Sequence, residues 1–241
     1  MGHGLGIEFL RRAGSAATWI GLLNILLVAT VIFFYFLLSF AHATSEYATI
    51  LAFLLICLGI GTLQCAMAYR STLGIRRQMR SRVIWVIRIS AIALWVVLLL
   101  GFVIAELPSA LIRHVLIDAP FYLFICFLIA LVPLVFGLGR HYGAICEDIG
   151  EGSKASAQRW MSGIMAFGFG AMLLTLMFVS IFDPLGPMAS FAETLTILGG
   201  SCLGFLCGSI GFLGWTILLL TTGASLREAA KNAQSATGGG S

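Results

Sequence analysis

Two histidines and three carboxylates are the residues of this chain whose types best suit ligand chemistry. His42 falls at the end of an apolar stretch and His114 in the link between two such stretches, on the same predicted side of a membrane as Glu46, Glu106 and Asp118. Two imidazoles can hold a haem, and imidazoles with carboxylates can hold a metal ion. Haem-binding bundles, however, present histidines from within their helices. We therefore expect a hydrated outer polar ring and predict no cofactor, with haem at His42 and His114 as the alternative.

A second group of possible ligands is His141 with Cys146, Glu147 and Asp148, whose spacing matches no standard metal motif. The chain also lacks the G-x-S-x-G and H-E-x-x-H motifs of hydrolases and a nucleotide-binding P-loop. It has six cysteines but no C-x-x-C pair, and we expect these cysteines to be small buried residues. We predict no catalytic or metal-binding residues and expect a non-enzyme.

The elements that must position these residues are strongly apolar. The chain has 241 residues, of which 60% are hydrophobic and 10% are charged, and its mean hydropathy is +1.04. Soluble domains carry about 25% charged residues, so this chain cannot cover itself with a polar surface. Uncharged runs of about 20 residues predict helices that cross a membrane. The predicted spans are residues 18–41, 47–69, 83–105, 120–138, 160–182 and 194–222.

These spans predict an all-α, polytopic integral membrane protein with six transmembrane helices in a single domain, residues 1–237. The Gly-Gly-Gly-Ser sequence at 238–241 is typical of a linker remnant. Residues 7–17 are expected to form a short interfacial helix before the first span. The segment 139–159 contains four glycines and mixed charges, which predict a mobile loop.

The basic residues are distributed unequally between the two sides of the membrane. All but one of the 14 fall on the side of the two termini if Arg88 snorkels there, and the exception is Arg113. This asymmetry predicts a plasma (inner) membrane protein with both termini in the cytoplasm.

One short segment on the cytoplasmic side is especially basic, and it contains Arg76, Arg77, Arg80 and Arg82. We expect it to act as a topology determinant, with binding of anionic lipid head groups as the functional alternative. Nucleic-acid binding is not expected, since no nucleic-acid-binding fold accompanies the segment.

The last span is unusually rich in glycine, in the sequence LGGSCLGFLCGSIGFLGW at 198–215. Gly200, Gly204, Gly208 and Gly211 share one helix face, and such small residues let two helices approach closely in lipid. The partner is either the fifth span, where Gly168 and Gly170 would complement the stripe, or the same helix of another subunit. On adjacent spans, Asn24 and Gln64 are at matching depths and can hydrogen-bond to each other.

These features favour a non-enzymatic membrane component that acts through helix packing, such as a complex subunit, a scaffold or a pore-forming oligomer. The partners expected are anionic lipid head groups and either further copies of the chain or other membrane subunits. The alternative is a small transporter or a haem- or metal-binding subunit that uses the outer polar ring.

The predicted orientation can be tested with reporter fusions after Lys231. Because the basic residues hold that end in the cytoplasm, alkaline phosphatase fused there should be inactive, whereas a fluorescent protein should fluoresce. A fusion with phosphatase activity comparable to that of an exported control would contradict the orientation.

Overall fold

The computed structural model describes residues 6–40, 46–73, 81–106, 119–182 and 191–238, and all regular structure within them is helical. The helices are α1 (Ile7–Phe40), α2 (Glu46–Ser71), α3 (Ser81–Glu106), α5 (Ala119–Asp148), α6 (Gly152–Phe182) and α7 (Phe191–Gly238). Five of them, α1, α3, α5, α6 and α7, contain segments long and apolar enough to cross a membrane. The remaining one, α2, has 26 residues and covers the predicted span 47–69. The prediction of an all-α, polytopic membrane protein is therefore confirmed.

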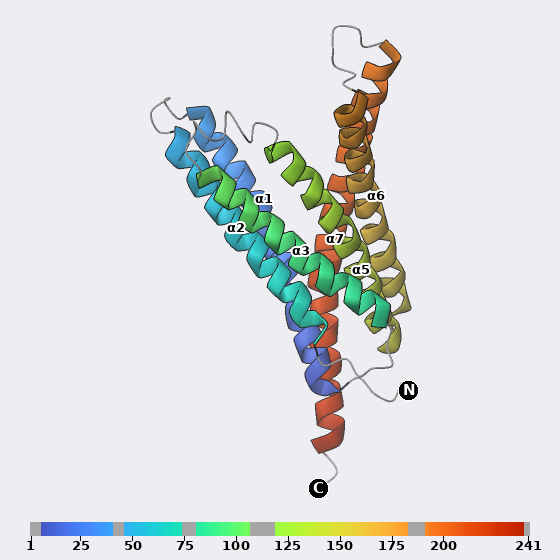
Figure 1. Ribbon diagram of the computed structural model, residues 1–241. Coiled ribbons are helices and arrows are strands. Elements are labelled where there is room, and N and C mark those ends of the chain that lie inside the picture. The colour runs from blue at the N-terminus through green and yellow to red at the C-terminus, as the bar shows by residue number, and fades with distance from the viewer. Residues whose placement is uncertain (1–5, 41–45, 74–80, 107–118, 183–190, 239–241) are drawn as a thin grey trace.

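The described helices form a ring. Each helix packs against the next one along the chain, and α7 also packs against α1. In Figure 1, α7 lies beside α6 in the upper part of the view and beside α1 in the lower part. We call the end where α1 begins and α7 ends the inner end, and the opposite end the outer end. Toward the outer end, α1 and α7 diverge (Figure 1).

The prediction of a mobile loop at 139–159 is wrong, because α5 and α6 continue through most of this segment. Gly150 ends α5 with a φ of 85°, which glycine adopts without steric cost. The amide of Glu151 donates to the carbonyl of Cys146 (2.8 Å), and that of Gly150 donates to the carbonyl of Glu147 (3.0 Å). This pair of bonds is a Schellman motif, and it satisfies carbonyls that the helix end would leave unpaired. The two helices are therefore joined by a tight turn.

Residues 7–17 do not form a separate interfacial helix, because α1 is continuous from Ile7 to Phe40. At the other end of the chain, α7 continues well beyond the predicted boundary at residue 222. The ends of four helices thus project past the predicted spans, over residues 7–17, 139–148, 152–159 and 223–238. We call these segments the inner extension. They contain some of the most buried side chains of the protein, including Tyr142, Ile145 and Leu226.

Three exposed tryptophans lie near the level where the inner extension begins. Trp19, Trp85 and Trp160 each lie within two residues of the start of a predicted span, and all are exposed. Trp85 and Trp160 are at similar heights, since Ile87 and Ser162 pack on α5 at Gly137 and Gly139, only two residues apart. Exposed tryptophans are typical of the membrane–water interface. We therefore expect the hydrocarbon core to end near these tryptophans.

Candidate functional site

The outer polar ring lies outside the part of the chain whose side chains are described. His42, His114 and Asp118 fall in segments between the described ranges. Glu46 is the first residue of α2 and Glu106 the last residue of α3, but their side chains are also outside the described part. The expectation for this ring therefore stays a prediction.

Only one of the four arginines of the basic segment lies in the described part of the chain. Arg76, Arg77 and Arg80 lie outside the described residues, whereas Arg82 is at the start of α3 and is exposed to the surroundings. The binding of lipid head groups by this segment also stays a prediction.

The possible ligands around His141 point to different partners. The Nε2 atom of His141 lies 3.2 Å from the backbone oxygen of Ser71. Cys146 points to Thr222, and Glu147 forms an ion pair with Arg159 at 2.6 Å. Within the described residues, no group of three or more His, Cys, Asp or Glu side chains is arranged to hold a metal ion.

The glycine stripe of α7 faces α6, which contains the fifth predicted span. A Cβ atom placed on Gly168 would lie 2.7 Å from the Cα of Gly208 and 2.8 Å from the carbonyl oxygen of Gly204. A Cβ on Gly211 would lie 2.5 Å from the amide nitrogen of Met165. The two backbones thus approach too closely for a side chain at Gly168 or at Gly211.

Gly200 and Gly170 of the predicted set do not meet the backbone of the facing helix. Gly200 faces the side chain of Thr175, where an added Cβ would lie 2.6 Å from Oγ1. Gly170 has nothing within 4 Å of its Cβ position, although it is two residues from Gly168. It therefore takes no part in the close approach between α6 and α7.

A second close approach, between α1 and α7, was not predicted from the sequence. A Cβ on Gly14 would lie 3.0 Å from the carbonyl oxygen of Gly223, and a Cβ on Gly223 would lie 2.8 Å from that of Gly14. The signal was the run of small residues at 222–225, which resembles the stripe but lies on another face of α7. As a result, α7 makes backbone contacts with α6 and α1 on two different faces.

Polar side chains join α7 to the neighbouring helices at the inner half of the bundle. The Nε2 of Gln64 donates to the Oδ1 of Asn24 (2.7 Å), which confirms the predicted hydrogen bond between α1 and α2. Asn24 in turn donates from Nδ2 to the hydroxyl of Thr216 (3.0 Å) on α7. One carboxamide therefore joins three helices.

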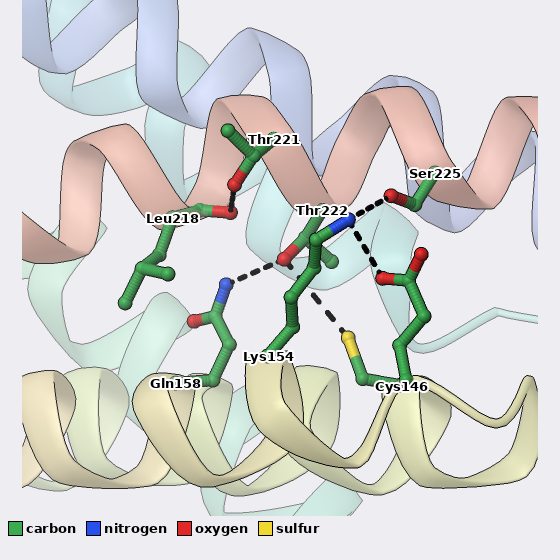
Figure 2. A network of polar contacts seen from close by, with 8 residues as sticks. Cys146, Lys154, Gln158, Leu218, Thr221, Thr222 and Ser225 are labelled. Carbon is green, nitrogen blue, oxygen red and sulfur yellow. Dashed lines mark hydrogen bonds and ion pairs between the residues drawn. The ribbon is translucent and has the colours of Figure 1, made fainter.

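A second polar group is centred on Thr222, one and a half turns further along α7. Figure 2 shows Gln158 and Cys146 reaching the Thr222 hydroxyl from α6 and α5. Gln158 donates from Nε2 at 2.8 Å, and the sulfur of Cys146 is 3.9 Å away. Next to them, Lys154 donates to the hydroxyl of Ser225 at 2.5 Å and pairs with Glu151 at 2.9 Å.

All the bonds to Asn24, Thr222 and Ser225 in these two groups connect one helix to another, so their physical role is to fix helix positions. In lipid, such bonds and close packing replace the hydrophobic effect as the source of helix association. The chain matches no protein-family model, no curated protein sequence and no solved structure. The fold and the site define a class, a polytopic helical membrane protein whose last helix packs against both α6 and α1.

The close approach of α6 and α7 can be tested with two neighbouring glycines. We expect Gly168→Ala to lower the free energy of unfolding by about 1–3 kcal/mol, because its methyl group meets the backbone of Gly208. Gly170→Ala should be neutral or stabilising by up to about 1 kcal/mol, since alanine is the better helix former. Thermal unfolding in detergent measures both, and equal melting temperatures would show that the packing described here is wrong.

The bonds to Thr222 can be tested against the adjacent threonine. Thr222→Val keeps the shape but leaves the buried amide of Gln158 without its acceptor, so we expect a loss of about 1–2 kcal/mol. Thr221 is exposed and donates to Leu218 of its own helix, so Thr221→Val should change stability by less than about 0.5 kcal/mol. The prediction fails if the two variants unfold at the same denaturant concentration.

Proposed function

We propose that this chain is a non-enzymatic component of a membrane assembly, and that a transmembrane helix of a partner subunit packs between the outer halves of α1 and α7. One observation carries the proposal. At the inner end, one face of α1 packs against one face of α7. The same two faces continue to the outer end, where they no longer touch and are exposed.

Helix periodicity identifies these faces. An α-helix returns to the same face after about five turns, which is 18 residues. Ile32 lies that far beyond Gly14 on α1, and Phe205 lies that far before Gly223 on α7. Gly14 and Gly223 touch, yet Ile32 is 51% exposed and Phe205 is 69% exposed. The divergence of the two helices in Figure 1 accounts for this difference.

A helix suits this position better than lipid chains do. The uncovered faces are continuous with the α1–α7 interface, so an added helix would extend packing that already exists. Ser209 lies about two turns before Thr216 on the same face of α7. Small polar residues of this kind are typical of contacts between helices in membranes.

Two other functions from the sequence are less well supported by the described residues. A pore-forming oligomer assembled through the glycine stripe would need a face of α7 that is already packed on α6. A transporter or haem-binding subunit would use the outer polar ring, whose side chains lie outside the described part of the chain.

We also propose that the inner end faces the cytoplasm and that the chain resides in the plasma (inner) membrane. Every basic residue in the described part of the chain lies toward the inner end. Most are in the inner extension, and the others are Arg70 near the end of α2 and Arg82 and Arg88 near the start of α3. Short segments rich in arginine and lysine are typical of the cytoplasmic side.

The partner helix can be detected with a photoreactive residue, benzoylphenylalanine, placed at Ile32 or at Phe205 in cells. The control position is Ile92, an exposed residue of α3. Irradiation of native membranes should give a protein adduct at Ile32 and Phe205 but none at Ile92. The mass of the adduct identifies the partner, because a second copy adds 25.8 kDa and another subunit adds a different mass.

Two results would overturn this proposal. If none of the three positions gives a protein adduct, the outer faces of α1 and α7 contact lipid. If Ile92 gives the same adducts with the same yield, the cross-links at Ile32 and Phe205 are not specific.

A further inference from the structure

We infer that the inner corner between α2 and α3 binds the phosphate head group of an anionic phospholipid, with Arg88 as the central contact. This inference concerns a surface other than the outer faces of α1 and α7, and it does not depend on the partner helix proposed above. Four features support it: a fixed guanidinium, the absence of a carboxylate partner in the described residues, flanking aromatic rings, and an adjoining apolar stripe.

The guanidinium of Arg88 is held in place by the end of α2. Its Nε donates to the hydroxyl of Thr72 at 2.9 Å, and its Nη2 donates to the backbone oxygen of Thr72 at 3.0 Å. Thr72 is fully buried, so it provides a rigid support. The cation also stabilises the negative end of the α2 dipole. These contacts use two of the five N–H donors of arginine, and three remain for a ligand.

Arg88 has no acidic partner in the part of the chain that the structure describes. The ion pairs of Arg12 with Glu8, Lys154 with Glu151 and Arg159 with Glu147 all lie in or beside the inner extension. None of them includes Arg88. A half-buried cation without a counterion favours binding of an anion, and a planar guanidinium suits phosphate oxygens.

One aromatic ring lies beside the Arg88 guanidinium and another lies one turn away on α3. The Cζ of Arg88 lies 5.4 Å from the centre of the Tyr69 ring. Trp85 precedes Arg88 by one turn on α3 and is 63% exposed. Amphipathic rings of this kind are typical of the level of lipid head groups, which suits binding of a phosphate by the Arg88 guanidinium.

An apolar stripe leads from this corner toward the outer end. Ile89, Ile92 and Val96 follow Trp85 along one face of α3, and all are exposed. An acyl chain attached to a phosphate at Arg88 would lie along this stripe. The combination of a cation with an apolar stripe selects a phospholipid over a free phosphate ion. Arg82 is also exposed at the start of α3, which adds positive charge on the aqueous side.

The test is a titration of the purified protein in detergent with phosphatidylglycerol and with phosphatidylcholine, followed by native mass spectrometry. We expect the wild-type protein to bind the anionic lipid at least about fivefold more tightly, since one interfacial charge contributes about that much. Arg88→Gln should remove this preference. The matched control is Arg140→Gln, which removes the same charge from an exposed arginine that lies over Phe136 on α5. The control should change the affinity less than about twofold.

A second variant covers the possibility that Arg88→Gln does not fold. Trp85 is exposed, so Trp85→Ala should fold normally and weaken binding of phosphatidylglycerol. Equal losses for Arg88→Gln and Arg140→Gln, or equal binding of both lipids to the wild-type protein, would overturn the inference. Displacement of the lipid by millimolar inorganic phosphate would show a site for free anions instead.

Discussion

The architecture depends on the backbone contacts that α7 makes on two of its faces. Lipid provides no hydrophobic force between helices, so helices associate in a membrane through close packing and hydrogen bonds. Gly204 and Gly208 bring α7 against Gly168 of α6, while Gly223 brings it against Gly14 of α1. These contacts close the ring of helices, because α1 and α6 are held on either side of the same long helix.

The two glycine contacts are at different heights, and this difference shapes the whole molecule. The contact with α6 lies in the outer half of α7 and the contact with α1 in the inner half. The polar groups around Asn24 and Thr222 also lie in the inner half, where they join α7 to α1, α2, α5 and α6. The inner half is therefore a tightly joined body, and the outer halves of α1 and α7 are left apart with apolar faces uncovered.

Both surfaces proposed to bind partners follow from this arrangement. The uncovered outer faces are suited to another helix because they continue an existing helix interface. At the inner end, by contrast, α2 ends beside Arg88 of α3. The corner between these two helices combines a positive charge, aromatic rings and an apolar stripe. The inner extension is a compact set of helix ends, in which carboxylates form ion pairs with Arg159 and Lys154.

The sequence by itself determined the class of fold, because burial in lipid and satisfaction of the backbone are local requirements that one apolar segment meets alone. It also placed Gly204 and Gly208 on one helix face, because helix periodicity alone gives the face. The rise per residue alone gives the matching depths of Asn24 and Gln64. The tertiary structure decided which helix packs against the glycine stripe, and it brought Gly14 into contact with Gly223. It also decided that Arg88 donates hydrogen bonds to Thr72. These depend on the rotation and crossing of two helices far apart in the chain, which no local pattern contains. The glycines and charges around Gly150 predict a flexible loop, whereas the burial of Tyr142 and Ile145 in the structure stabilises helix up to the turn at Gly150.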